Sequence, residues 1–291
     1  MKKLRLCCLL GDHLDLLPHF IKHYQSLGVD EFDFIIHSPD DCSKTKTEML
    51  LQKLGQKPAG YLQGTWTGAA ATLAINEFIS RFPQQWFIIA DSDEFQLYSK
   101  PLRLVIAELE NTQQHFLTGC MLDRIAADGN LVKAIENQSI WEQFPLAGFI
   151  SFPLMQANPL KITLCKGTVH LSEGQHGVQL QGNAHPIRSA VLCQVHHFKW
   201  REDILPKLFS RLQAIKLGHW EAAYKGYGEE IQRAMNYFQA NQGHFQINET
   251  TFLLAKAKPV YQSYLHWEKV QQITASWKSL QSSSILSPNE L

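Results

Sequence analysis

The run Asp91-Ser92-Asp93-Glu94 places three carboxylates directly after an apolar stretch, residues 86–90. Two carboxylates two positions apart, with a small residue between them, can both reach one hard cation where the chain turns away from a strand. Mg²⁺ or Mn²⁺ held in this way keeps positions open for diphosphate oxygens and water, and as a Lewis acid it offsets the charge of a leaving nucleoside diphosphate. The spacing therefore indicates a metal and nucleotide site formed by Asp91 and Asp93, with Glu94 in the site or next to it. The alternative is a solvated acidic turn.

Other charged side chains can contribute to such a reaction. Asp123 follows a predicted strand and can take the proton of an acceptor hydroxyl in an inverting displacement, although a surface turn formed by Asp123 and Arg124 is an equal alternative. Lys166, Arg188 and Lys199 can contact a diphosphate, because a positive group there offsets the leaving charge. For each of them a solvated surface position is the alternative.

The helices and strands that position these residues can be predicted most clearly in the first half of the chain. Short apolar runs alternate with helical patterns over the first ninety residues, which is typical of βαβ units around a parallel sheet. Strands are predicted at 4–10, 32–37 and 86–90, and helices at 16–27, 43–54 and 67–82. The strand at 86–90 is apolar at every position, so we expect it to be central and covered on both faces. Its carboxyl end is the edge at which ligand-binding loops converge.

The second half has a looser pattern. Shorter strands are predicted at 116–122, 162–171 and 191–198, and helical periodicity returns from 202 to about 240. We predict an α/β, Rossmann-like fold with a mixed, mainly parallel sheet flanked by helices and a C-terminal helical extension. The expected divisions are a catalytic domain at 1–200, a helical region packed on it at 201–275, and a flexible tail at 276–291.

Composition excludes several classes of protein. Lysine plus arginine and aspartate plus glutamate number 27 each, and apolar residues make up 45% of the chain, so neither disorder nor a nucleic-acid partner is indicated. The six cysteines show no CxxC spacing, which favours reduced thiols in a cytoplasmic protein. Residues 4–10 are too short and too charged for a signal peptide, and no stretch reaches the roughly 18 apolar residues of a transmembrane segment.

Two ordered segments, WFIIADSDEF at 86–95 and LPHFIKHYQSLGVD at 17–30, resemble the GT-A glycosyltransferases, specifically their family 2-like and family 92-like branch. Residues 86–95, WFIIADSDEF, resemble the metal-binding strand of that branch, which is followed by D-x-D-E-F. Residues 17–30, LPHFIKHYQSLGVD, resemble its helix with an H-Y pair and an L-G-V turn. Both matches lie within about the first hundred residues, and a looser match at 195–199, VHHFK, extends the resemblance towards residue 200.

The resemblance implies a GT-A fold and a nucleotide-sugar donor, most simply UDP-linked. It also implies a divalent ion, Mn²⁺ or Mg²⁺, held by Asp91 and Asp93. The loop after the second strand would help to hold the nucleotide, which maps onto Ser38, Asp40 and Asp41. The acceptor would be a glycan or another hydroxyl compound, as in polysaccharide biosynthesis.

Enzymes of this fold often take a third metal ligand from a late strand, where this chain carries His196 and His197. Successive side chains of a strand point to opposite faces, so at most one of the two reaches the metal, and His197 is the preferred ligand. His176 lies in a glycine-flanked turn that either closes over a substrate or is structural. The segment 10–13, LGDH, departs from the K-N-E-like tripeptide that members commonly carry after strand one.

Two other functions compete with this interpretation. One is another metal-dependent nucleotidyl or phosphoryl enzyme. A haloacid-dehalogenase-like phosphatase needs its motif after the first strand with Thr or Val in place of Phe95, and a nucleotidyltransferase needs a glycine-rich basic loop where this chain has residues 10–13. The other is a non-catalytic GT-A-like protein that binds a carbohydrate or a partner, which a motif alone does not distinguish from an enzyme.

Overall fold

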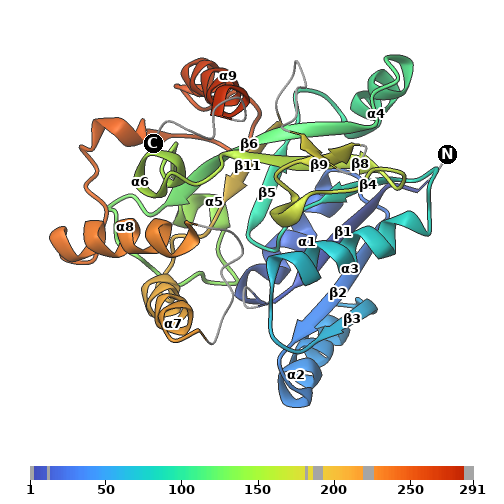
Figure 1. The fold of residues 1–291 in the computed structure, drawn as a ribbon, viewed down its shortest axis with the longest axis horizontal. Helices are drawn as coiled ribbons and strands as arrows, with labels where there is room; N and C mark the ends of the chain where they lie inside the picture. Colours follow the sequence, from blue (N-terminus) through green and yellow to red (C-terminus); the bar gives the residue numbers. More distant parts are fainter. Residues whose placement is uncertain (1–2, 12–13, 181–182, 186–192, 219–225, 285–291) are drawn as a thin grey trace.

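The computed structural model describes residues 3–11, 14–180, 183–185, 193–218 and 226–284 (Figure 1). The strands are β1 Arg5–Leu10, β2 Glu31–Ser38, β3 Pro58–Gln63, β4 Trp86–Ile89, β5 Glu94–Leu97, β6 Phe116–Ile125, β7 Leu146–Gly148, β8 Leu160–Lys166, β9 Val178–Leu180, β10 Asn183–His185, β11 Cys193–His197 and β12 Ala255–Lys256. The α-helices are α1 Leu17–Ser26, α2 Asp41–Lys53, α3 Gly68–Ser80, α4 Leu102–Asn111, α5 Ile140–Gln143, α6 Ser151–Met155, α7 Ile204–Lys216, α8 Tyr227–Ala240 and α9 Trp267–Ser284. Arg188 lies outside the described residues.

One large sheet organises the molecule. Its main path has the order β12-β7-β6-β8-β4-β1-β2-β3, and β11 joins it by pairing with β6 and with β5. The pairs β1–β2, β1–β4, β2–β3 and β6–β11 are parallel, whereas β8 is antiparallel to both of its neighbours. Following these pairings, β5, β7 and β8 run against the other strands of the sheet. The predicted α/β class with a mixed, mainly parallel sheet is therefore confirmed.

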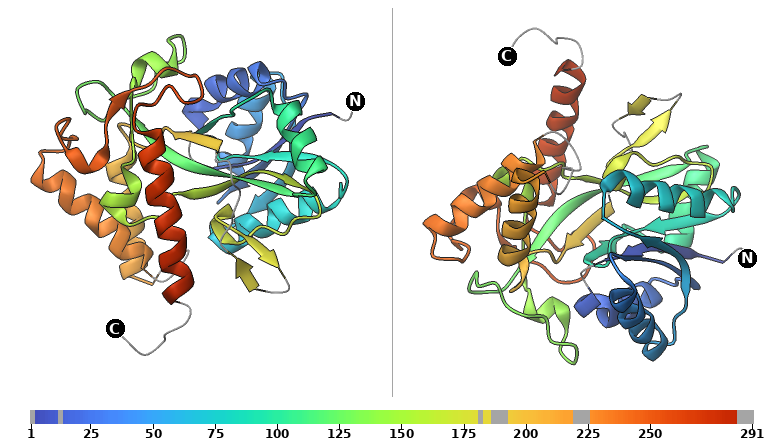
Figure 2. Two further views of the ribbon diagram at one scale, coloured as in Figure 1. Left: turned by 90° about the horizontal axis from the view of Figure 1, so that it is seen from above. Right: turned by 60° about the horizontal axis from the view of Figure 1, so that its bottom comes forward.

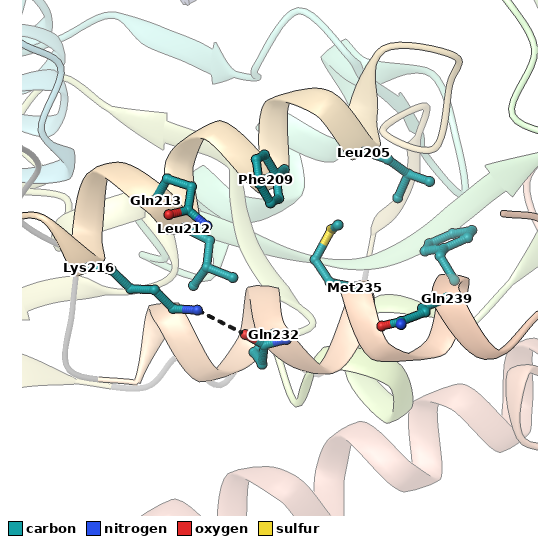
Figure 3. Close-up of a pocket in the computed structure, with 9 residues that line it drawn as sticks. Leu205, Phe209, Leu212, Gln213, Lys216, Gln232, Met235 and Gln239 are labelled. Carbon is teal, nitrogen blue, oxygen red and sulfur yellow. Dashed lines mark hydrogen bonds between the residues drawn. The ribbon is translucent and has the colours of Figure 1, made fainter.

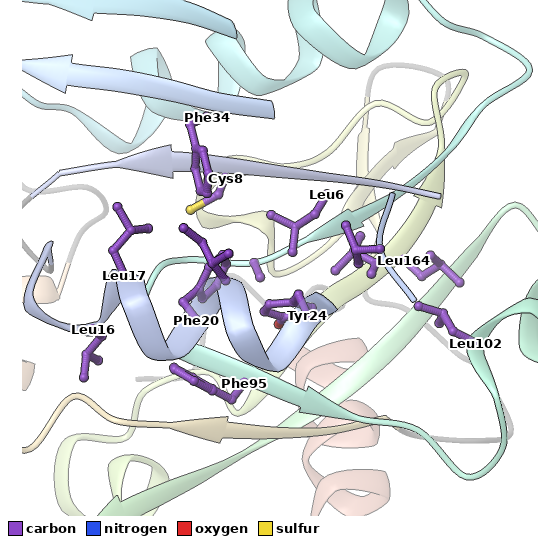
Figure 4. Packing of buried hydrophobic residues seen from close by; sticks show 14 of the residues in the cluster. Leu6, Cys8, Leu16, Leu17, Phe20, Tyr24, Phe34, Phe95, Leu102 and Leu164 are labelled. Carbon is purple, nitrogen blue, oxygen red and sulfur yellow. The ribbon is translucent and has the colours of Figure 1, made fainter. Parts of the chain in front are cut away.

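Helices cover both faces of the parallel half, so β4 is buried on each side. Trp86 and Ile88 belong to the same core cluster as Phe20 and Tyr24 of α1, part of which is shown in Figure 4. The alternate residues of β4, Phe87 and Ile89, pack instead with α3. The central position that the apolar sequence of this strand predicted is thus confirmed, and the chain leaves the sheet at Ala90 from a strand that is buried on both faces.

Capping side chains stabilise the N-termini of α2 and α3, which lie at the carboxyl edge of the sheet. Asp40 accepts a hydrogen bond from the backbone N–H of Ser43 at 2.7 Å and so caps α2, and Thr67 caps α3 through Ala70 at 3.1 Å. Each such cap stabilises a helix by about 1 kcal/mol. Because the helices begin just after strands end, their N-termini collect at the edge where the acidic run lies.

The C-terminal helical extension is also confirmed, with differences in its limits. The region from 202 to 240 contains two helices, α7 and α8, which pack with α6 in a third core cluster around Trp200. An open groove of about 420 Å³ lies between α7 and α8, with Phe209 and Met235 on its walls and Lys216 and Gln232 hydrogen-bonded at its rim (Figure 3).

The last helix reaches further than the sequence indicated. Helix α9 continues to Ser284, into the stretch that we expected to be a tail, while residues 285–291 lie outside the described residues. Its first turns place Trp267 and Val270 against Cys120 and Leu122 of β6, and Figure 2 shows it as the red helix. Among the described helices none is long and apolar enough to cross a membrane.

Candidate functional site

The acidic run lies where β4 ends and β5 begins. Strand β5 pairs with β11 so that Glu94 is opposite His197, and β11 pairs with β6 so that His197 is opposite Asp123. The backbone N–H of Phe198 also donates to the carbonyl of Asp93 at 2.8 Å. These pairings bring together three segments that are far apart in the sequence. They bury Asp93 and Glu94, while the side chain of Asp91 keeps 44% of its surface exposed.

His197 links two aspartates in this site. Its Nδ1 atom lies 3.0 Å from Oδ1 of Asp123, and its Nε2 atom lies 3.5 Å from Oδ2 of Asp93. Burial disfavours a charged imidazole, but the two carboxylates outweigh burial and raise the pKa of His197 to about 10. Without a metal ion the ring is therefore protonated at neutral pH and offsets one of the two negative charges beside it.

Asp123 is held by three hydrogen-bonding contacts and in turn holds His197 in place. Its carboxylate accepts hydrogen bonds from the backbone N–H of Ser151 at 2.6 Å and from the Ser151 hydroxyl at 2.9 Å, in addition to the contact with His197. It is 1% exposed, and its role as a base stays a prediction. The alternative of a surface turn is wrong, because Asp123 and Arg124 are both buried in β6.

A lysine that the sequence analysis did not single out occupies the other side of the acidic run. The Nζ atom of Lys161 lies 2.6 Å from Oδ2 of Asp91 and 2.9 Å from Oε1 of Glu94. The second oxygen of Glu94 accepts the backbone N–H of Asp91 at 3.1 Å. Burial raises the pKa of Glu94 to about 7, against the opposing effect of Lys161, and the two carboxylates raise the pKa of Lys161 despite its own burial. Glu94 therefore supports the turn and does not face an open site.

His196 and His197 are neighbours in β11, so their side chains point to opposite faces of the sheet. His196 points away from His197: its Nδ1 accepts from Nε of Arg124 at 3.0 Å, and its ring packs edge-on against Trp141. His176 lies near the ion pair, with its Nδ1 2.5 Å from the carbonyl of Leu160. Burial, followed by the charge of Lys161, lowers the pKa of His176 to about 4, so the ring is neutral at physiological pH.

The expected nucleotide residues lie at the same edge of the sheet but are not in contact with the acidic run. Ser38 ends β2, which is separated from β4 by β1, and it is buried. The carboxylate of Asp40 is occupied in capping α2, and Asp41 accepts from Gln63 at 3.3 Å. Their role in nucleotide binding stays a prediction.

The two lysines expected to contact a diphosphate have different positions. Lys199 lies beside the site, with its Nζ 3.4 Å from Sδ of Met155, and burial lowers its pKa, with Asp123 acting in the opposite direction. Lys166 is at the wrong end of the sheet. Because β8 is antiparallel to β4, Lys166 pairs with Trp86 at the start of β4, and its Nζ lies 3.9 Å from Glu110. The expectation for Lys166 is therefore corrected.

A divalent ion needs several oxygen or nitrogen ligands around one point. Across the described ranges no group of three or more His, Cys, Asp or Glu side chains is arranged to hold a metal ion. The pair that fits is Asp93 and His197, since two ligands bound at about 2.1 Å to one ion lie roughly 3.0 to 3.5 Å apart. A carboxylate on the far nitrogen of the histidine, here Asp123, is the usual support of such a ligand. Mg²⁺ and similar ions take their other positions from phosphates and water.

Comparison of the sequence with protein-family models and with curated proteins finds no match. Among solved structures, a crystal structure of S. aureus TarS 1-349 is 14% identical with a TM-score of 0.32, covering 82% of this chain and 72% of that one. A putative glucose-1-phosphate thymidylyltransferase from Bacillus anthracis is 11% identical with a TM-score of 0.29, covering 93% and 95%. A UDP-glucose pyrophosphorylase complexed with UDP-glucose is 10% identical with a TM-score of 0.28, covering 95% and 100%. Similarity this low does not define a family, so function rests on the site itself.

Proposed function

We propose that this chain is a metal-dependent glycosyltransferase, which moves a sugar from a nucleotide-sugar donor, most simply a UDP-sugar, to a hydroxyl of a glycan or another acceptor. The observation that carries the proposal is the convergence of Asp93 and His197 at the carboxyl edge of the sheet, with Asp123 on the far side of the imidazole. Two protein ligands leave most of an ion's coordination to the diphosphate of a donor. A cytoplasmic location and a role in polysaccharide assembly belong to the same proposal.

Each residue of the site has a distinct task in this reaction. Asp93 and His197 would hold Mn²⁺ or Mg²⁺, which supplies Lewis-acid charge to the leaving nucleoside diphosphate when bound. As a ligand His197 would have no proton on Nε2, while its Nδ1–H would donate to Asp123, which orients the ring. The exposed part of the Asp91 side chain is available to a bound donor.

The sequence supports the same assignment independently. Residues 86–95 and 17–30 resemble GT-A glycosyltransferases, and in the structure they lie together: Tyr24 of α1 donates its hydroxyl hydrogen to the carbonyl of Glu94 at 2.9 Å. The two segments that carry the resemblance are thus one structural unit beneath the site. This contact joins α1 to the turn that contains Asp91 and Asp93.

Calorimetry with UDP in the presence and absence of Mn²⁺ tests the proposal. We expect UDP binding that requires Mn²⁺ and is lost in Asp93→Ala, and slow release of UDP from a suitable UDP-sugar. Asp128→Ala is the control, because Asp128 is an exposed aspartate that hydrogen-bonds to the neighbouring Asn130. UDP binding that is independent of both Mn²⁺ and Asp93 would favour a non-catalytic binding protein. Pyrophosphate release from a nucleoside triphosphate and a sugar phosphate would favour a nucleotidyltransferase.

A further inference from the structure

Lys161 is almost fully buried, with 3% of its surface exposed. Its ammonium group contacts Asp91 at 2.6 Å and Glu94 at 2.9 Å. A lysine buried to this extent is rare unless it is paired, and here it is paired with two carboxylates of one acidic turn. The first aspartate of the run therefore already has a cation at one of its oxygens.

Lys161 belongs to β8, a strand inside the sheet, and it does not reach the site from a surface loop. Strand β8 pairs antiparallel with β4, with Trp86 opposite Lys166 and Ile88 opposite Leu164. Lys161 itself lies in β8 and is paired with Gly119 of the neighbouring strand β6. The ammonium group is thus fixed to the edge of the sheet by the backbone pairing of its own strand.

We propose that Lys161 is a resident cation that keeps a divalent ion off Asp91 and confines it to Asp93 and His197. The inference deepens the proposed function and rests on it for the identity of the metal ligands. An ion bound to Oδ2 of Asp91 would lie no more than about 5 Å from the ammonium group, given metal–oxygen distances near 2.1 Å. Repulsion between the two charges opposes that arrangement, and it is strong because the ammonium group is shielded from water.

The charges of the turn lead to the same conclusion. Four carboxylates lie in this region. Lys161 contacts those of Asp91 and Glu94, and His197 contacts those of Asp93 and Asp123. Without Lys161, Asp91 and Asp93 would form the two-carboxylate pair that the sequence suggests, and that pair would attract a divalent ion more strongly. Lys161 is in this sense a positioning residue, which decides which side of the turn the ion occupies.

The test is the affinity for Mn²⁺ in the absence of nucleotide, measured by electron paramagnetic resonance of the free ion. We expect Lys161→Met to bind Mn²⁺ at least about tenfold more tightly than the wild type, because a positive charge next to Asp91 is removed. Adding Asp91→Asn to Lys161→Met should abolish the gain, and Lys161→Arg, which keeps the charge, should show none. A merely structural role of Lys161 would weaken binding and would not strengthen it.

Circular dichroism and thermal melting check that each variant is folded. If Lys161→Met alone does not fold, Lys161→Met combined with Glu94→Gln removes the buried pair as a whole, and the same gain in Mn²⁺ affinity is expected. An affinity that is unchanged or lower in the folded variants, or a gain that persists in the Asp91→Asn background, overturns the inference. If the wild type binds no Mn²⁺ with UDP but Lys161→Met does so through Asp91, the proposed function fails and the role of Lys161 stands.

Discussion

The Nδ1 atom of His197 lies 3.0 Å from Oδ1 of Asp123, and the two residues come from neighbouring parallel strands at paired positions. Strand pairing sets this contact, so the imidazole is held by the sheet and not by a loop. Two further hydrogen bonds from Ser151, one to each carboxylate oxygen, fix Asp123. The other ring nitrogen is thereby directed at Asp93.

Replacing Asp123 by asparagine separates support of a metal ligand from a role as catalytic base. We expect Asp123→Asn to weaken Mn²⁺ binding by about 10- to 100-fold, because the carboxylate that orients His197 is lost. A base would instead lower turnover and leave Mn²⁺ affinity unchanged. Asp33→Asn is the control, since Asp33 is a buried aspartate paired with Arg5 far along the sheet. Calorimetric titration of both variants with Mn²⁺ and UDP makes the comparison.

Gly119 allows β6 to lie between β8 and β11, and so brings His197 to Asp123. A Cβ atom at this position would meet Cγ2 of Thr163 and Cγ2 of Val195, each at 2.5 Å. We expect Gly119→Ala to lower the free energy of unfolding by about 1 to 3 kcal/mol through overpacking. A Cβ atom at Gly60 would lie 3.8 Å from the nearest atoms of Ile35, so Gly60→Ala should change the free energy of unfolding by less than about 0.5 kcal/mol. Urea unfolding of both variants measures the difference, and equal losses would contradict the explanation.

Arg201 connects the segment after β11 to the segment after β1. Its guanidinium group forms two hydrogen bonds to Asp15, at 3.0 and 3.1 Å, and it is 1% exposed. We expect Asp15→Ala to destabilise the fold by about 1 to 3 kcal/mol, less than for a fully buried pair because the Asp15 side chain is 36% exposed. The exposed pair of Lys100 and Glu108 provides the control, where Glu108→Ala should cost no more than about 0.5 kcal/mol. Thermal melting distinguishes the two, and a similar loss in both would be evidence against this role.

His23 makes the fold sensitive to acid. Burial lowers its pKa to about 4, whereas in the unfolded chain a histidine titrates near 6.5. Between these values the unfolded state binds a proton that the native state does not, so stability is lost as the pH falls from about 6.5 to 4. We expect the wild type to lose about 2 kcal/mol more than His23→Gln between pH 7 and pH 4.5. The exposed His115 serves as the control, since His115→Gln should retain the wild-type loss in urea titrations at the two pH values.

Much of the first half of the fold could be predicted because its signals are local. The apolar run at β4, the helix α1 with Pro18 in its first turn, and the acidic residues after β4 each lie within a short segment. Strand β3 was not located, since Pro58–Gln63 contains glycine and proline and is buried only in part. The helical region of residues 202 to 240 was identified by periodicity, but its division into two helices was not.

The sequence alone determined that this chain forms an α/β sheet whose buried strand β4 ends in Asp91-Ser92-Asp93-Glu94, because apolar periodicity and turn chemistry act between near neighbours. Only the tertiary structure decided what those carboxylates meet. Lys161 reaches Asp91 and Lys166 does not, because β8 runs antiparallel to β4. His197 meets Asp123 through the register of β6 and β11, which follows from packing between segments distant in sequence.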